Sequence, residues 1–142
     1  CLSIKKMFIE KDEFDVGIRR LLNYGHTFGH ALELASNYTI PHGVAVARGM
    51  DIVNYIAVKK ELMGKILYDE IHNIIIEYFY SDRVFGICPK VLIENTKKDK
   101  KNSNGMLNLV FLGELGNLFV KPIQLDSELN AIVSSYIEEN FC

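Results

Sequence analysis

The chain has few cysteines and no long hydrophobic run, and each shortage excludes a class of protein. Its 142 residues include only Cys1, Cys88 and Cys142, which are too few and too scattered for a disulfide framework or a zinc ribbon. No apolar run reaches the roughly 18 residues of a transmembrane helix, and the N-terminus lacks the features of a signal peptide. We therefore expect a soluble cytoplasmic protein with no membrane association.

The chain also lacks an excess of charge of either sign. Lysine and arginine total 16 and aspartate and glutamate total 18, for a net charge of −2, and the two signs are interspersed. This balance offers no basic face to a polyanion, so we expect no nucleic-acid partner. The length is typical of one domain, 1–142, and a start at Cys1 instead of methionine leads us to expect a piece of a longer protein.

Hydrophobic periodicity predicts a mainly α domain with one small β-hairpin. The expected helices cover 2–13, 26–35, 42–62, 66–80, 90–96 and a last segment that is capped by Asp126 or Ser127. The short apolar runs 106–111 and 118–120 flank a turn at 113–116 and are typical of a hairpin.

Two of these helices carry predictions about burial. The helix over 42–62 is apolar on several sides, which is typical of a buried helix. In the helix over 66–80, one apolar face is expected to point inward and comprises Leu67, Ile71, Ile74, Ile75 and Tyr78.

Three of the four histidines, His26, His30 and His42, fall in one short stretch, and each lies beside a glycine. His26 and His30 are four residues apart, so on a helix their Cβ atoms lie about 5–6 Å apart on one face. Such a pair either shares a metal or a substrate or only caps and packs, and the spacing alone leaves both open. A catalytic zinc takes three protein ligands, so two or three of these histidines, completed by a carboxylate, fit a metal site. The fourth histidine, His72, is interpreted as structural.

Glycines and cations surround this stretch. Gly25 and Gly29 each cost about 1 kcal/mol against alanine inside a helix, so close packing or a ligand is expected to require them. Several cations and one amide precede the histidines or follow them at a distance: Lys5, Lys6, Arg19, Arg20, Asn23, Lys97, Lys98, Lys100 and Lys101. Either these are ordinary surface cations, which is the favoured interpretation for the four later lysines, or as a group they bind an anionic substrate.

The histidine stretch resembles a known family. The run LLNYGHTFGHALE at 21–33 and the run HGVAVARGM at 42–50 are similar to the C-terminal domain of 3-dehydroquinate synthases. Gly17-Ile18-Arg19 ahead of the first run and Asp99-Lys100-Lys101 later in the chain extend the resemblance over essentially all of its length.

The resemblance implies an enzyme of the shikimate pathway that forms 3-dehydroquinate and phosphate from 3-deoxy-arabino-heptulosonate 7-phosphate. It implies two cofactors, NAD and a divalent metal, either zinc or cobalt. It also implies a second, N-terminal α/β domain, absent from this chain, which carries the NAD site and a glutamate metal ligand. We expect the full-length enzyme to be a homodimer, and this chain alone to lack NAD-binding residues.

The resemblance also assigns roles to individual residues. His26 and His42 correspond to the family's two histidine metal ligands, and His30 to a histidine that contacts substrate hydroxyls and assists proton transfer. The remaining matches are substrate-binding: Lys5 and Arg19, which are also counted as catalytic, near the carboxylate, Asn23 near the phosphate, and Lys100 or Lys101 on the phosphate.

Two departures from the family pattern keep alternatives open. Val44 and Asp15 stand where the family commonly or often has glutamate. Related sugar-phosphate cyclases such as 2-deoxy-scyllo-inosose synthase share the scaffold and remain an alternative. An iron-type alcohol dehydrogenase shares the two-domain plan, but a simple alcohol needs no anion clamp. A third alternative is a non-catalytic helical domain with packed histidines, which we would adopt if the imidazoles of His26 and His42 lay far apart or if either pointed into the apolar core.

Overall fold

The structure is a computed structural model that describes residues 2–12, 17–79, 86–98 and 105–141. Its elements, in chain order, are α1 (Leu2–Lys11), the 3-10 helix η1 (Ile18–Asn23), α2 (His26–Ala35), α3 (His42–Lys59), α4 (Lys65–Tyr78), α5 (Pro89–Thr96), β1 (Met106–Glu114), β2 (Asn117–Gln124) and α6 (Ser127–Asn140). The predicted class, mainly α with one hairpin, is therefore confirmed. Among the described helices, none combines the length and apolar character that a membrane span requires.

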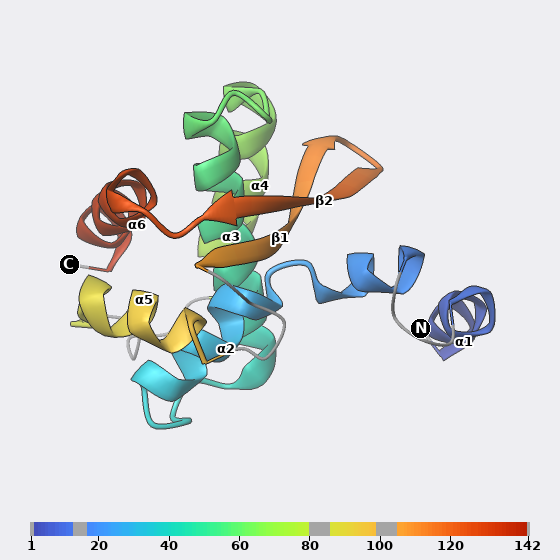
Figure 1. The fold of residues 1–142 in the computed structure, drawn as a ribbon, viewed down its shortest axis with the longest axis horizontal. Coiled ribbons are helices and arrows are strands. Elements are labelled where there is room, and N and C mark those ends of the chain that lie inside the picture. Colours follow the sequence, from blue (N-terminus) through green and yellow to red (C-terminus); the bar gives the residue numbers. More distant parts are fainter. Residues whose placement is uncertain (1, 13–16, 80–85, 99–104, 142) are drawn as a thin grey trace.

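Helix α3 is the central element, and most of the others pack around it (Figure 1). It contacts α2, α4, α6 and β1, whereas α1 lies to one side and packs on η1. Nearly all of α3 from residue 45 to residue 57 is buried, as its apolar pattern predicts. Because α2 packs along the first half of α3, the histidines that begin the two helices have their rings close together.

The contact between α2 and α3 is made by glycines. A Cβ atom placed on Gly49 would lie 2.1 Å from the carbonyl oxygen of Gly25, and one placed on Gly29 would lie 2.9 Å from Cα of Val46. Gly25 also has φ +77°, a left-handed conformation that glycine adopts without strain. Close packing thus requires the two glycines that the sequence analysis selected, which confirms that expectation.

The hairpin is longer than the sequence predicts. β1 and β2 pair antiparallel in a two-stranded sheet, and the turn narrows to Leu115 and Gly116 because Glu114 already pairs with Asn117. The sequence pattern does not predict the second half of β2, because Pro122 lacks the backbone N–H that a strand donates to its neighbour. It is tolerated opposite Asn108 because β2 is an edge strand of this sheet.

The predicted inward face of α4 is partly wrong. Tyr68 and Ile75 are buried and Leu67 and Ile71 pack partly against the core, but two residues expected inside, Ile74 and Tyr78, are 54% and 70% exposed. Those two are four residues apart and share the face turned away from α3. A helix with a neighbour on one side buries only one stripe, and the apolar residues of α4 spread wider than that stripe.

Buried polar side chains of α3 form hydrogen bonds with residues of the surrounding elements. Oδ2 of Asp51 accepts a hydrogen bond of 2.5 Å from the Tyr136 hydroxyl and pairs with Nδ1 of His72 at 2.8 Å. Oδ1 of Asn54 accepts a hydrogen bond of 2.5 Å from the Tyr24 hydroxyl. Burial raises the pKa of Tyr136 well above its ordinary value, and the negative charge of Asp51 adds to the shift. His72 thus has a structural partner, in agreement with its interpretation as a structural residue.

Tyr24 provides a test of this buried network by pH. Burial, together with the smaller effect of the Asp51 charge, raises the pKa of Tyr24 to about 12. Its hydroxyl therefore contributes its stability fully below about pH 10, the ordinary pKa of tyrosine, and loses it as the pH rises through about 12. A rapid pH jump read by phenolate absorbance should show that Tyr24→Phe removes a group titrating near pH 12. Loss of a group titrating near pH 10 instead would contradict the burial of this hydroxyl.

The glycine contact provides a test by mutation. Gly49→Ala should lower the free energy of unfolding by about 1–3 kcal/mol, the usual cost of overpacking, because the new methyl group meets backbone atoms. Denaturant unfolding measures the change. Gly43→Ala is the matched control in the same helix, since its added Cβ has nothing within 4 Å. Equal stability of the two variants would contradict the close approach.

Candidate metal centre

Three imidazoles gather where α2 and α3 begin. His26 is the first residue of α2, His30 follows one turn later, and His42 is the first residue of α3. Their ring centroids lie 5.5 Å apart for His26 and His30, 5.7 Å for His26 and His42, and 6.0 Å for His30 and His42. The ring of His26 is half-buried, and those of His30 and His42 are exposed.

These distances fit coordination of one metal ion. Two imidazoles bound to the same tetrahedral zinc at about 2.0–2.1 Å per Zn–N bond have ring centroids about 5 Å apart. The observed separations are close to this value and need only small side-chain rotations. Because the imidazoles cluster near the surface and none points into the apolar core, the interpretation as a domain with merely packed histidines is disfavoured.

Two of the three rings are held through Nδ1. Nδ1 of His26 lies 3.2 Å from the carbonyl oxygen of Tyr24, and Nδ1 of His42 lies 3.1 Å from Oε1 of Glu33. A carbonyl and a carboxylate only accept, so Nδ1 carries the proton in both rings, and in the neutral ring Nε2 carries the lone pair. This is the usual state of a metal-binding histidine, whose second ring N–H is donated to a carbonyl or carboxylate.

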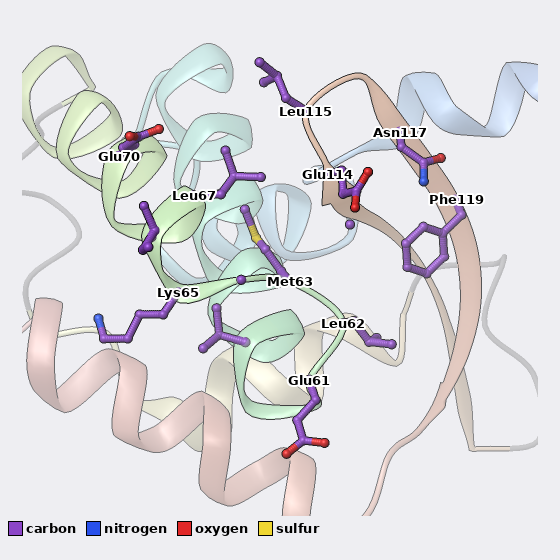
Figure 2. Close-up of a pocket in the computed structure, with 14 residues that line it drawn as sticks. Glu61, Leu62, Met63, Lys65, Leu67, Glu70, Glu114, Leu115, Asn117 and Phe119 are labelled. Carbon is purple, nitrogen blue, oxygen red and sulfur yellow. The ribbon is translucent and has the colours of Figure 1, made fainter.

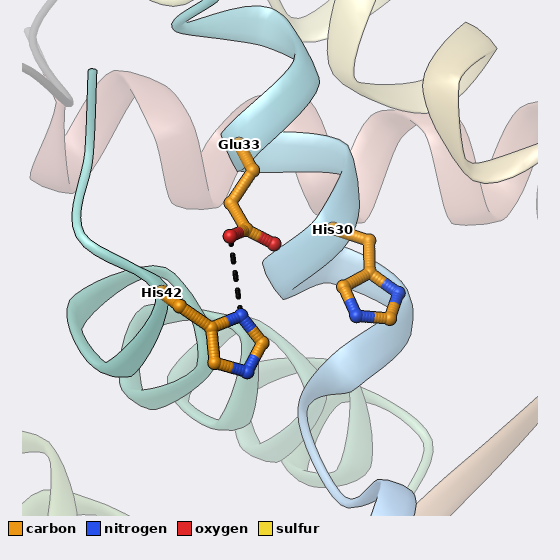
Figure 3. A group of neighbouring side chains, drawn as sticks. All are labelled: His30, Glu33 and His42. Atoms are coloured by element: carbon orange, nitrogen blue, oxygen red, sulfur yellow. Dashed lines mark hydrogen bonds and ion pairs between the residues drawn. The ribbon is translucent and has the colours of Figure 1, made fainter. Parts of the chain in front are cut away.

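His30 differs from the other two. No residue that the structure describes forms a hydrogen bond with its ring, although the ring lies close to those of both His26 and His42. Figure 3 shows His30 and Glu33 projecting from α2 on the same side, toward His42 at the start of α3. One possible ligand atom from each of these three residues lies within 4.8 Å of the others.

Glu33 is the site residue that sequence reasoning missed. It is three residues after His30 and seven after His26, which puts all three on one face of α2. This spacing is the sequence feature that could have identified Glu33 as a site residue. It does not reveal the partner of Glu33, because His42 lies nine residues later and on another helix.

The predicted anion-binding residues are only partly described. Arg19 and Asn23 are half-buried on η1, which leads directly into α2. Lys100, Lys101 and Asp15 lie outside the described residues, as does the side chain of Lys5, whose backbone belongs to α1. Other residues mentioned with them have ordinary surroundings: Lys97 pairs with Glu94 at an exposed helix end, and Val44 packs partly against the core.

The described part of the chain also has a cavity away from the imidazoles (Figure 2). It has a volume of about 1060 Å³ and lies between the α3–α4 connection and the hairpin turn, where Met63, Leu67 and Phe119 line it. None of the residues predicted to bind metal or substrate lines this cavity. The histidine cluster therefore remains the candidate site.

Comparison with solved structures supports the fold. The chain superposes on a 2-deoxy-scyllo-inosose synthase complexed with carbaglucose-6-phosphate, NAD+ and Co2+, with a TM-score of 0.78. The sequences are 21% identical, and the match covers 95% of this chain and 39% of that one. A second structure of a 2-deoxy-scyllo-inosose synthase matches with a TM-score of 0.69 at 22% identity, over 87% of this chain and 34% of that one.

Curated relatives at higher identity are 3-dehydroquinate synthases. The protein of Clostridium perfringens is 40% identical over 121 residues, which are 84% of this chain and 35% of that protein. The protein of Dehalococcoides mccartyi is 35% identical over 137 residues, which are 96% of this chain and 37% of that protein. The chain thus spans about a third of the length of these relatives.

A protein-family model locates the similarity within the chain. The model described as 3-dehydroquinate synthase C-terminal matches residues 1–102, a span that includes α1, η1 and all three clustered histidines. The match covers well over half of the 142 residues. The chain therefore belongs to the 3-dehydroquinate synthase C-terminal family.

Proposed function

We propose that this chain is the metal- and substrate-binding domain of a 3-dehydroquinate synthase of the shikimate pathway. The reaction is the conversion of 3-deoxy-arabino-heptulosonate 7-phosphate to 3-dehydroquinate and phosphate. The observation that carries the proposal is the cluster of three imidazoles in which His26 and His42 are each held through Nδ1. The names of the relatives at 35–40% identity support the same reaction.

In this proposal His26 and His42 hold a divalent metal, either zinc or cobalt, through Nε2. The Co2+ and NAD+ in the related 2-deoxy-scyllo-inosose synthase support a metal and NAD here. When bound, the metal supplies Lewis acidity at a substrate oxygen and NAD supplies hydride exchange. The glutamate ligand and the NAD site belong to an N-terminal domain outside this chain, so residues 1–142 provide two of three protein ligands.

The chain's own residues then bind the substrate and move protons. His30 is exposed, lies within 6.0 Å of both other rings, and has no hydrogen-bond partner among the described residues, so its ring is available to a substrate hydroxyl. Histidine is suited to proton transfer near neutral pH. Arg19 on η1 and Lys5 on α1 bind the substrate near its carboxylate.

The proposal also covers the phosphate end of the substrate and the oligomeric state of the full-length protein. Asn23, together with Lys100 or Lys101, binds the substrate phosphate. The full-length protein acts as a homodimer in the cytoplasm, on a small phosphorylated sugar acid.

A related sugar-phosphate cyclase activity is the second candidate. The structural match to 2-deoxy-scyllo-inosose synthase and the presence of Val44 favour it. Its 21% identity indicates a shared fold, whereas identities of 35–40% link the chain to 3-dehydroquinate synthases. Offering the full-length protein 3-deoxy-arabino-heptulosonate 7-phosphate or glucose 6-phosphate, and measuring phosphate release, separates the two.

The roles of His42 and His30 are separable by mutation in the full-length protein. His42→Ala should lower metal affinity more than the roughly 100-fold that follows loss of an outer hydrogen bond to a ligand. His30→Ala should leave metal affinity near that of the parent and lower kcat by about 10²–10⁴-fold, the usual contribution of a general acid or base. Titration of the metal against a chelator and steady-state kinetics measure the two effects. If His30→Ala weakened metal binding and His42→Ala lowered only kcat, the roles of these two histidines would have to be exchanged.

The isolated chain should be inactive. Residues 1–142 are expected neither to bind NAD nor to release phosphate from the heptulosonate phosphate in the presence of NAD and zinc, because the NAD site and one ligand lie elsewhere. Calorimetry with NAD and a phosphate assay measure both, with circular dichroism to show that the chain is folded. Phosphate release by the folded chain alone would contradict the proposed division of the site.

A further inference from the structure

We propose that Glu33 is a positioning residue that fixes the tautomer and the orientation of His42 for metal binding. This inference rests on the proposed metal role of His42. It assigns Glu33 no contact with the metal or with the substrate.

The geometry of the pair indicates that Glu33 is the restrained side chain and His42 the one that is free to rotate. The side chain of His42 is 58% exposed, whereas that of Glu33 is 14% exposed, and Nδ1 and Oε1 are 3.1 Å apart (Figure 3). An exposed imidazole on the first residue of a helix has freedom to rotate, and packing at this position does little to restrict it. The mostly buried carboxylate supplies the restriction instead.

The backbone of Glu33 is also tied to the connection that leads to His42. Its carbonyl oxygen accepts a hydrogen bond from the backbone N–H of Tyr38 at 2.7 Å and from the hydroxyl of Ser36 at 3.1 Å. Tyr38 has φ 58°, so the chain reverses here in a left-handed conformation. Glu33 therefore anchors both the turn between α2 and α3 and the side chain that follows the turn.

The chemistry of the pair sets the tautomer. An ionised carboxylate only accepts, so Nδ1 of His42 must carry a proton, and the lone pair of the neutral ring is then on Nε2. The hydrogen bond at one ring nitrogen determines which nitrogen binds a metal.

The same geometry argues against Glu33 as a ligand beside His42. The two ring nitrogens of an imidazole point in widely different directions, and Glu33 occupies the Nδ1 side. If His42 holds the metal through Nε2, the metal would be on the other side of the ring, beyond the reach of the oxygen that accepts from Nδ1. Glu33 thus acts through His42.

Metal affinity of the full-length protein tests the inference directly. Glu33→Ala should weaken Co2+ binding about 10–100-fold, the usual effect of losing such an outer partner. Glu33→Gln should weaken it less, because the amide oxygen still accepts from Nδ1. Competition against a chromophoric chelator measures both affinities.

Glu139→Ala is the matched control. Glu139 likewise accepts one side-chain hydrogen bond, from the Tyr55 hydroxyl at 2.9 Å, but it lies on α6 and outside the histidine cluster. Its removal should leave Co2+ affinity unchanged. A loss of affinity equal to that of Glu33→Ala would mean that general destabilisation explains both, and would overturn the inference.

The absorption spectrum of bound Co2+ separates positioning from coordination. At saturating Co2+, Glu33→Gln should give the ligand-field spectrum of the parent protein, since no ligand is lost. A changed spectrum would make Glu33 a ligand and overturn the inference, as would parent-like Co2+ affinity in Glu33→Ala. Parent-like affinity in His42→Ala would instead refute the proposed metal role of His42, so the two failures are distinguishable.

Discussion

The backbone contact between α2 and α3 governs the positions of all three clustered imidazoles. At Gly25, Gly29 and Gly49 the two helices approach so closely that an added Cβ would meet backbone atoms at 2.1–2.9 Å. Any side chain there would push the helices apart, and His42 starts one helix while His26 starts the other. The ring separations of 5.5–6.0 Å depend on this contact, although none of these glycines offers a ligand atom.

The candidate site is also connected to the buried polar groups of α3 through one residue. The carbonyl oxygen of Tyr24 accepts from Nδ1 of His26, and the hydroxyl of the same residue donates to the buried Asn54. A tyrosine hydroxyl is a protonated donor throughout the neutral range, and burial extends this range for Tyr24 by raising its pKa to about 12. The core of the domain thus orients one histidine through Tyr24, and the mostly buried carboxylate of Glu33 orients another.

The sequence predicted features that depend on local pattern and missed those that depend on tertiary surroundings. The helix positions, the buried α3 and the need for Gly25 and Gly29 follow from periodicity and residue type. The exposed face of α4, with Ile74 and Tyr78, depends on how many neighbours that helix has, which no local pattern records. The second half of β2 could not be predicted, because Pro122 is acceptable in a strand only when the strand is at an edge, and the sequence does not show that position.

The same distinction explains what was found at the site. The histidines are visible in sequence because they cluster, and the pairing of His26 with His42 needed the family resemblance, since spacing alone favoured His26 with His30. Glu33 was visible on the face of α2 but gains its meaning only when the turn brings His42 beside it. One histidine is held by a backbone carbonyl and the other by a carboxylate, so the two rings have different Nδ1 partners although both present Nε2. The exposed ring, which packing cannot hold, is the one that has the charged partner.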